Sequence, residues 1–538
     1  MATYGIDLGT TYSCIAYIDG AGRPVIAKTD LGEETLPSVV HFEAPDNVVV
    51  GRAAKNVALL DPSNVVSLIK RQMGQEVEFD FHGQAQTPES ISALILQALA
   101  QAAESGTGEP VRDVVVTVPA YFGVAEREAT KQAGRIAGLN VLQVVPEPVA
   151  AALHYEALSG GRDRTILMFD LGGGTFDTTV ILLHDQDVTV ACTDGDHHLG
   201  GADWDAKIVE YLIDQFTSAH PDLDPGGDEQ FLQALNTDAE QLKKDLSRAQ
   251  ARKYNVRFGA EVVKVELTRE TFEDLTADLL EETLQITQRT LATAREKGIT
   301  HFDEVLLVGG SSRMPAVAAK LREKPFGFKP KLVDPDLAVA KGAALFAVIE
   351  SIKLSLDDGD NGLAASDVAV QQAANQLGIS TEKVKELAKK KVTTVVPRAF
   401  GVKVLDSDDP SLQKEHIEHL LAANSPLPAQ PPPQRFATVV PNQTQIKVEV
   451  WEQAGAKASR ELAHNALIGE GLIDGLPPLP AGSPLEITMA MDEMGTLTVK
   501  AIELKTKRDL EIVLTIGGLS DAEVEAARNA QTRITVSE

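Results

Sequence analysis

The sequence predicts a mixed α/β region over residues 1–350, followed by an antiparallel β region over residues 393–517. In the first region, short apolar runs alternate with long amphipathic stretches, a pattern typical of α/β folds. In the second region the apolar residues recur at every second position, as in strands that bury one face. The first region also contains a duplication, because Asp7-Leu8-Gly9 and Asp170-Leu171-Gly172 each open a glycine- and threonine-rich bend between two apolar runs.

The α/β region is expected to begin with a β-hairpin around the first bend. A polar turn after Asp61 should lead into a short helix that ends in Lys70 and Arg71, for which a solvated helix end is the plain interpretation. Pro88 suits the first position of a helix, and the apolar residues behind it recur at three- and four-residue spacing. We expect strands at 37–42, 48–50, 114–118 and 141–145, and helices at 88–105 and up to Gly138.

Glu147 stands between two prolines, which hold it on a stiff bend. It leads a helix whose small residues at 149–153 predict close helix packing near a cleft. A carboxylate at a helix N-terminus is commonly only a partner of the helix dipole, so the structural and the catalytic interpretation both stand here. The second bend follows, and its flanking apolar runs at 166–169 and 180–183 predict a second β-hairpin.

Two further glycine-rich turns occur before residue 350. The first spans 194–203, where we interpret His197 and His198 as loop residues because no third metal ligand is near. The second, Gly309-Gly310, ends the strand 305–308 at a helix start, where backbone can approach a phosphate or a flat ring. Helices are expected at 204–218, 229–249 and 268–297 and from Ala338, and the second sets Glu240, Lys243, Lys244 and Ser247 on one face.

Residues 353–391 differ in character from both regions. A loop at 357–360 and two short helices at 366–376 and 381–390 have the spacing of a helix-turn-helix, but the acidity of the chain favours a helical hairpin inserted between domains. In the β region, strands are expected at 400–402, 436–439, 446–450, 485–489, 497–499 and 510–516. A short helix within 518–538 should follow, opened by a capping box from Ser520 to Glu523.

Composition limits the classes of function. A length of 538 residues predicts two to four domains. The net charge of −28 argues against a nucleic-acid or anionic-membrane surface, yet it allows one compact anion in a cleft that backbone amides and a cation line. Two cysteines give no disulfide framework, and no apolar stretch is long enough to cross a bilayer, so we expect a cytoplasmic protein.

The paired bends indicate a phosphate clamp. Successive glycines leave backbone N–H groups free to point at an anion, and the flanking Asp7 and Asp170 can hold the waters of a metal ion. One such bend alone is more often an ordinary tight turn, whereas two suggest a duplicated fold that grips one nucleotide from two sides. The strand–loop–helix spacings of a P-loop or a dinucleotide fingerprint are absent.

These motifs together resemble those of the seventy-kilodalton heat-shock chaperone family (DnaK-type), of which the chain looks like a divergent, bacterial-like member. The resemblance covers nearly all of residues 1–350 and, more loosely, 395–525. The motifs that carry it are 6–14, 116–122, Glu147-Pro148, 169–177, 199–201, 307–315 and Pro335-Asp336.

The resemblance implies an actin-like, duplicated ribonuclease-H-like ATPase domain of two lobes over 1–350, with ATP or ADP and Mg²⁺ between the lobes; the family also admits K⁺. Asp7 and Asp170 would face the hydrated Mg²⁺, and Lys70, Glu147 and Thr175 would act with them in slow ATP hydrolysis, by placing the attacking water and stabilising charge on the γ-phosphate. The phosphates would be wrapped by Gly9, Thr10, Thr11, Tyr12, Gly172, Gly173, Gly174 and Thr175. The nucleoside would be enclosed by Gly200, Gly201, Glu240, Lys243, Lys244, Ser247, Gly309, Gly310, Ser312, Arg313 and Asp336.

For residues 393–517 the resemblance implies a β-sandwich that binds extended apolar peptides of unfolded proteins. The positions that match the family's peptide cleft are Phe400, Val402, Leu405, Phe436, Val439, Ile446 and Val448. Alternating apolar residues are usually simple core, and only the motif match favours a cleft here. The implied partners are a J-domain cochaperone and a nucleotide exchange factor, and the chain would act as a monomer.

The sequence departs from the family pattern in four places. Lys244 stands where the family usually has an Arg that stacks on adenine, so weaker nucleotide affinity is expected. The family's short acidic-apolar linker is replaced by a helical insertion or linker within 351–392. The helical lid is absent beyond the helix near 520–532, which we interpret as a lid remnant, and the first lobe is shortened after Met73.

Three functions follow as hypotheses. The leading one is an ATP-dependent chaperone in which nucleotide controls peptide affinity. The alternative is a nucleotide-regulated binding scaffold with little or no coupling between ATP and peptide. A sugar kinase built on the same actin-like lobes fits less well, because the C-terminal β region has no place in it.

Overall fold

The structure is a computed structural model of the chain. It describes residues 3–159, 163–184, 187–357, 370–371, 374–375, 380–406, 413–455, 457–514 and 519–538. Most of the predicted helix 366–376 lies outside these residues, as do Thr515 and Ile516 of the last predicted strand. Among the described residues, no helix combines the length and apolar character needed to cross a bilayer.

The first sheet has the strand order β11-β10-β1-β2-β3, with β4 beside β2. Strands β1 and β2 form the predicted antiparallel hairpin, whereas β10 and β11 run parallel to β1. Helices α2 and α3 pack against each other beside this sheet, and we call residues 3–146 the first lobe. The bounds are β1 (Tyr4–Asp7), β2 (Tyr12–Ile18), β3 (Pro24–Ala27), β4 (Leu36–Pro37), β10 (Asp113–Val118), β11 (Asn140–Pro146), α2 (Pro88–Thr107) and α3 (Val124–Ile136).

The second sheet repeats the first. Its order is β18-β17-β12-β13-β14-β19, so β12, β13, β14 and β17 take the places of β1, β2, β3 and β10, with the same directions. The duplication inferred from the two bends is therefore confirmed, and we call residues 147–393 the second lobe. The bounds are β12 (Arg164–Leu171), β13 (Phe176–His184), β14 (Asp187–Asp196), β17 (Glu304–Val308), β18 (Lys331–Leu332) and β19 (Val392–Thr393).

Two helices of small residues pack between the sheets. Helix α4 (Glu147–Ser159) crosses α10 (Ala338–Asp357), and α10 also contacts β1, β2 and β10. The crossing is so close that a Cβ on Gly342 would lie 1.7 Å from the carbonyl oxygen of Ala150. The predicted close packing behind Glu147 is confirmed, because only small side chains let the two backbones approach this far.

The outer part of the first lobe differs from its prediction at 65–71. Val65 and Val66 form strand β7, which pairs with β5, and only Ile69–Gln72 form a single 3₁₀ turn. The β-branched valines favour a strand where a helix was expected. The remaining elements are α1 (Arg52–Val57), β5 (Val40–Ala44), β6 (Asn47–Val50), β7 (Val65–Val66) and the unpredicted hairpin of β8 (Phe79–Phe81) and β9 (Gln84–Gln86).

The outer part of the second lobe is mainly helical. The predicted helix 268–297 is two helices, which separate at Thr276, where the Thr276 hydroxyl donates to the carbonyl of Phe272. Helix α10 continues to Asp357, where a loop was expected. The bounds are α5 (Gly201–Ala219), α6 (Glu229–Leu246), β15 (Ala251–Phe258), β16 (Glu261–Thr268), α7 (Arg269–Leu275), α8 (Ala277–Glu296) and α9 (Pro315–Arg322).

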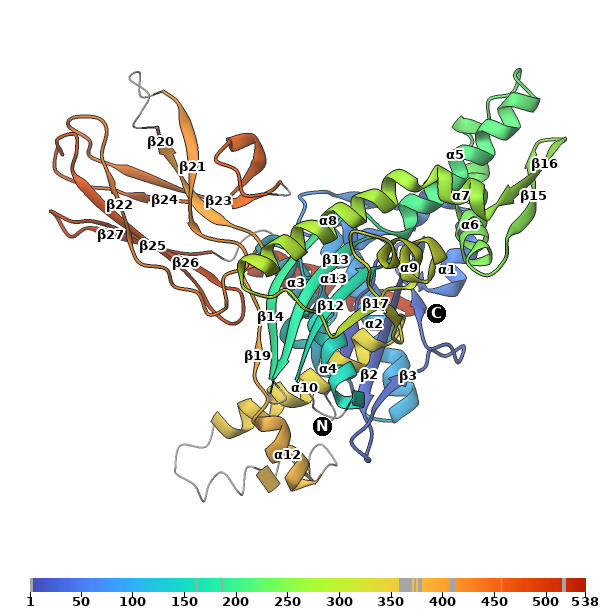
Figure 1. Cartoon of the computed structure of the whole chain (residues 1–538), viewed down its shortest axis with the longest axis horizontal. Helices are drawn as coiled ribbons and strands as arrows, with labels where there is room; N and C mark the ends of the chain where they lie inside the picture. The colour runs from blue at the N-terminus through green and yellow to red at the C-terminus, as the bar shows by residue number, and fades with distance from the viewer. Residues whose placement is uncertain are drawn as a thin grey trace.

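The last residues of the insertion, 381–393, pack on the second lobe before the β region begins. Helix α12 (Thr381–Ala388) packs on α10 through the buried Val384 and Leu387. Strand β19 then pairs in parallel with β14 at the edge of the second sheet (Figure 1). The first residues of the period-two pattern thus belong to the second sheet.

The β region, residues 394–514, contains two four-stranded antiparallel sheets that share one apolar core. Their orders are β21-β20-β23-β24 and β22-β25-β26-β27. Two strands were missed, since β21 carries charged or His side chains at most positions and β24 contains two glycines. The bounds are β20 (Phe400–Leu405), β21 (Glu415–Leu421), β22 (Gln434–Ala437), β23 (Ile446–Gln453), β24 (Asn465–Ile473), β25 (Pro484–Met491), β26 (Leu497–Glu503) and β27 (Asp509–Leu514).

The C-terminal segment lies on the first lobe. Helix α13 (Asp521–Gln531) has the predicted capping box, but it packs on α3, and β28 (Thr535–Ser537) pairs with β6. In Figure 1 the C-terminus lies near α1, on the side of the molecule opposite to the β region. The helix thus contacts the first lobe, and its interpretation as a lid remnant stays a prediction.

Candidate functional site

A cleft of about 1440 Å³ lies between the two lobes. Most of the predicted nucleotide residues line it: Asp7, Gly9, Thr10, Thr11, Tyr12, Lys70, Glu147, Asp170, Gly172, Gly173, Thr175, Glu240, Lys243, Lys244, Ser247, Gly309, Gly310, Arg313 and Asp336. Gly174, Gly200, Gly201 and Ser312 are not among the lining residues. The structure therefore brings together side chains from both halves of the α/β region.

The two glycine-rich bends touch each other across the cleft. A Cβ on Gly173 would lie 2.1 Å from the hydroxyl oxygen of Thr11, and a Cβ on Gly174 would lie 2.3 Å from the methyl group of Thr10. Neither position can carry a side chain unless the bends separate. The bends therefore meet edge to edge.

Hydrogen bonds fix the shape of each bend. The Ser38 hydroxyl donates to the carbonyl of Gly9 at 2.8 Å, and the amide of Gly9 donates to Ser13 Oγ at 3.1 Å. In the second bend, the Gly172 carbonyl accepts from the amide of Gly201 at 3.0 Å, which explains why Gly201 supports the cleft from behind its wall. Both loops are thus set before any ligand binds.

Four carboxylates and one ammonium group form the floor of the cleft: Asp7, Lys70, Glu147 and Asp170 line it, and Asp177 is buried behind them. Lys70 Nζ donates to Glu147 Oε1 at 2.6 Å, and both side chains are buried. Burial and the neighbouring Glu147 raise the pKa of Asp7 to about 7, with a hydrogen bond from Thr117 opposing the shift. The same causes raise the pKa of Asp170 above its usual range and that of Asp177 to about 7. One lysine does not balance this charge, so the floor favours a bound cation.

The chemistry of this floor fits a hydrated Mg²⁺ ion. Within the described ranges, no three His, Cys, Asp or Glu side chains gather in a way that could hold a metal ion directly. Mg²⁺ commonly keeps several of its waters and is held by one or two carboxylates together with phosphate oxygens. Asp7 and Asp170, on the two bends, are the residues that would hold such an ion.

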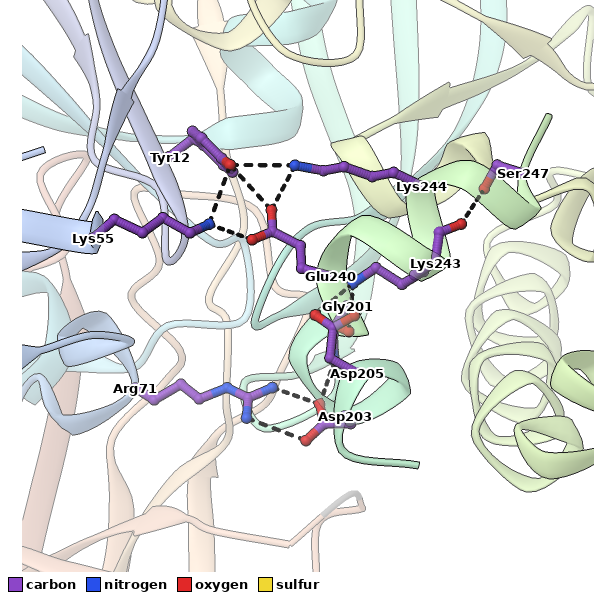
Figure 2. A network of polar contacts seen from close by, with 11 residues as sticks. Tyr12, Lys55, Arg71, Gly201, Asp203, Asp205, Glu240, Lys243, Lys244 and Ser247 are labelled. Atoms are coloured by element: carbon purple, nitrogen blue, oxygen red, sulfur yellow. Dashed lines mark hydrogen bonds and ion pairs between the residues drawn. The ribbon is translucent and has the colours of Figure 1, made fainter. Parts of the chain in front are cut away.

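A network around Glu240 joins the lobes at the rim of the cleft (Figure 2). Tyr12 donates to Glu240 Oε1 at 3.0 Å, Lys244 pairs with the same oxygen at 2.5 Å, and Lys55 pairs with Oε2. Burial alone would raise the pKa of Glu240, but Lys55 and Lys244 outweigh it and hold the pKa at about 2. The carboxylate is therefore charged at any physiological pH, and it bridges the first lobe to α6.

Arg71 forms a second bridge between the lobes. Its Nε donates to the Gly174 carbonyl at 2.9 Å, and its other nitrogens bond Asp203 in a fork, at 3.2 and 2.5 Å (Figure 2). Behind it, Lys243 Nζ donates to the Gly201 carbonyl at 2.7 Å and pairs with Asp205 at 2.8 Å. A guanidinium that holds both the second bend and α5 keeps the cleft closed at this point.

The turn at Gly309-Gly310 forms a further part of the cleft wall. Gly309 has a φ of +78°, and a Cβ there would lie 2.5 Å from Asp170 Oδ1, so only glycine fits beside this carboxylate. Ser312 is buried behind the wall, where its hydroxyl accepts from the amide of Leu171 at 3.3 Å. Arg313 pairs with Asp336 at 2.5 Å at the exposed edge. This turn therefore positions the second bend as well as lining the cleft.

A comparison with protein families identifies the chain. A family model described as Hsp70 protein matches residues 3–79, 75–399 and 360–538. The chain belongs to the Hsp70 family. Members of this family are in general ATPases that bind ATP or ADP with Mg²⁺ and act as chaperones.

Sequence motifs of this Hsp70-family chain did not reveal four residues of the cleft. Three of them form ion pairs between the lobes: Lys55, Arg71 and Asp203. The fourth, Asp177, accepts hydrogen bonds from the amides of Ala120 and Tyr121, at 2.9 and 3.1 Å. Asp177 stands seven residues after Asp170 in the second hairpin, so its strand position was a usable signal. The other three are distant in sequence from their partners, and no spacing rule connects them.

The predicted peptide positions divide into two groups. Phe400, Val402, Ile446 and Val448 are buried in the shared core of the β region. Leu405 and Phe436 are partly exposed, and Val439 is 38% exposed. The second group is accessible to a ligand, whereas the first shapes the sheets beneath it, so a peptide role for all seven stays a prediction.

Proposed function

We propose that the protein is an ATP-dependent chaperone, with an actin-like two-lobed ATPase and a β-sandwich that binds extended apolar peptides of unfolded proteins. The observation that supports this most is the contact of the bends Gly9–Tyr12 and Gly172–Thr175 above one carboxylate-lined floor. The cleft beside the bends, with a volume of about 1440 Å³, has room for a triphosphate and a nucleoside. Nucleotide bound there would touch both lobes at once.

The residues of the floor support phosphoryl transfer to water. Glu147 fixes Lys70 Nζ at 2.6 Å in a buried position, so the ammonium needs no reorganisation when charge develops on the transferred group. Thr175, buried at the end of the second bend, offers a hydroxyl to orient the attacking water. A hydrated Mg²⁺ beside Asp7 and Asp170 would neutralise phosphate charge.

Replacement of the buried lysine tests this assignment. Lys70→Ala should leave ATP bound but lower single-turnover hydrolysis at least about tenfold, which is about 1.4 kcal/mol of barrier. Glu147→Ala should act in the same direction, because it frees the Lys70 side chain. Lys329→Ala, at an exposed lysine, is the matched control and should hydrolyse ATP at the parent rate. Unchanged hydrolysis in both site variants would refute these roles.

Coupling between nucleotide and peptide is supported by a chain of contacts. Asp177 in the floor holds the amides of Ala120 and Tyr121, and the Tyr121 ring lies under the guanidinium of Arg398, 4.9 Å from its centroid. Arg398 belongs to the β region, so the loop 120–122 contacts both Asp177 behind the cleft and the β region. Mg-ATP should therefore speed the release of a fluorescent apolar peptide at least about threefold, whereas a scaffold without coupling would show no change.

A further inference from the structure

Asp334 lies in the wall of the cleft and has an unusual backbone conformation. Its φ is +35°, in the left-handed region that residues other than glycine rarely adopt. Its carbonyl accepts from the amides of Leu337 and Ala338, at 3.1 and 2.9 Å, at the point where α10 begins. A residue in this conformation persists only where the surrounding structure holds it, so the contacts of its side chain matter.

Two helices supply the groups that contact the Asp334 carboxylate. Lys341 of α10 donates from Nζ to Asp334 Oδ2 at 2.6 Å. His154 of α4 lies behind this pair, with its Nε2 3.8 Å from the same oxygen. Among the described residues, Lys341 is the only lysine or arginine that pairs with Asp334. The ion pair therefore joins the cleft wall to α10.

His154 lies beside the pair as a neutral side chain. Burial and the nearby Lys341 lower the pKa of His154 below its usual range, and the charge of Asp334 only partly opposes this shift. The Nδ1 atom of His154 is buried, and it has no hydrogen-bond partner in the part of the chain that the structure describes. At pH 7 the imidazole is therefore mainly uncharged, and Lys341 alone balances the charge of Asp334.

The crossing of α4 and α10 fixes both groups in space. Lys341 stands next to Gly342, where a Cβ would lie 1.7 Å from the carbonyl oxygen of Ala150. His154 follows Ala150 by about one helical turn. Because the two backbones are in contact at this point, neither helix can slide past the other, and Lys341 is held at a constant place beside the wall.

Residues 334–336, which we call the wall loop, contact three parts of the cleft. The Pro335 carbonyl accepts from the amide of Gly309 at 3.1 Å, and Asp336 pairs with Arg313. The Asp336 carbonyl also lies 3.8 Å from Cys14 Sγ on β2. Since Gly309, Arg313 and Asp336 line the cleft, a shift of the wall loop would move the residues expected to enclose a nucleoside.

We propose that Lys341 and Asp334 are positioning residues for the nucleoside end of the cleft. Their ion pair keeps the wall loop against the Gly309-Gly310 turn, and so sets how long a bound nucleotide stays. Without the pair, Asp334 can leave its left-handed conformation, and the loop can move away from the turn. The effect on nucleotide rests on the proposed function, whereas the effect on the loop in the nucleotide-free protein does not.

The test removes the cation first and then the charge that it balances. Lys341→Met keeps an unbranched apolar side chain but leaves the partly buried Asp334 carboxylate without its ammonium partner. The double variant Lys341→Met/Asp334→Asn removes both charges, and Asn tolerates a left-handed conformation. Lys353→Met is the matched control, because Lys353 lies on the same helix and pairs with Glu350, outside the cleft lining.

Without nucleotide, Lys341→Met should raise hydrogen exchange at the amides of Gly309, Leu337 and Ala338 at least about fivefold. It should speed the release of a fluorescent ADP analogue by a similar factor, but leave single-turnover hydrolysis at saturating ATP unchanged, since Lys70 and Glu147 keep their contact. The double variant should recover most of both losses, and Lys353→Met should match the parent.

Three results would overturn the proposal: parent-like exchange in Lys341→Met, a double variant no better than Lys341→Met, or a looser loop with an unchanged rate of ADP release. The second result would mean that Lys341 acts only by filling space, because the double variant restores the charge balance but not the lysine. A parent protein that binds no ADP would instead refute the proposed function, and the exchange measurement alone would then decide whether the pair positions the loop.

Discussion

The cleft between the lobes and the contact between the first lobe and the β region both bury charged groups, but they balance these charges differently. The cleft floor sets four carboxylates against one lysine. At the contact, two arginines face two carboxylates. Arg398 pairs with Glu126 at 2.9 Å and lies 3.7 Å from Glu452, and Arg127 is the second cation near Glu452. Glu452 Oε1 also accepts from the amide of Val124. The protein supplies its own cations there. An unbalanced buried cluster indicates a ligand site, whereas a balanced one indicates an interface.

The strongest test of this comparison is to remove Arg398, the cation that pairs with Glu126 at the contact. Arg398→Ala would remove the cation that pairs with the buried Glu126 and Glu452, so it should destabilise the contact by about 3 kcal/mol. Hydrogen exchange at Val124 and denaturant unfolding of the β region measure this loss. Arg435→Ala, at an arginine that is 78% exposed, is the control and should change neither. Parent-like exchange in Arg398→Ala would mean that the ion cluster does not hold the contact.

Mg-ATP binding in the cleft should depend on pH, because carboxylates are in excess there. A pKa of about 7 for Asp7 means that this group is mostly protonated at pH 6 and ionised at pH 8. Because Mg²⁺ needs the ionised form, Mg-ATP affinity should fall about tenfold from pH 8 to pH 6. Titration calorimetry at the two values measures it. With a chelator and no Mg²⁺ the trend should reverse, since protonated floor residues repel the phosphates less.

The smallest effect is expected at the rim, where the charges are partly exposed. Lys55→Ala removes one of the two cations on Glu240 and one bridge between the lobes. Exposed ion pairs are worth about 0.5 to 1 kcal/mol, so ADP should dissociate roughly threefold faster. Stopped-flow release of a fluorescent ADP analogue measures the rate. A change of a hundredfold would show that the rim, rather than the floor, carries most of the nucleotide affinity.

The sequence predicted those parts of the molecule whose determinants are local. The bends at Gly9 and Gly172, the helix behind Glu147 and the face of α6 each follow from residues a few positions apart. The 3₁₀ turn at Lys70 was misjudged, because the pairing of Val65 and Val66 with β5 decides the local structure there.

Long-range contacts account for the remaining differences. Arg71 reaches Asp203 across 132 residues, and Gln132 holds Leu519 across 387. The helix at 521–531 was predicted with its capping box. Its position on the first lobe depends on the buried Val524, and the sequence pattern does not show which element Val524 packs on. Similarly, the alternation of apolar residues around Phe400 and Ile446 is the same whether these side chains face a peptide or the core.

Calorimetric titration of the full chain with ATP in the presence of Mg²⁺ tests the central claim most directly. If the two bends close on one triphosphate, the heat should saturate at one nucleotide per chain, and Gly173→Val, which forces a side chain into Thr11, should abolish it. No saturable heat for the parent protein up to about 1 mM ATP, a limit of about 4 kcal/mol of binding free energy, would contradict the account.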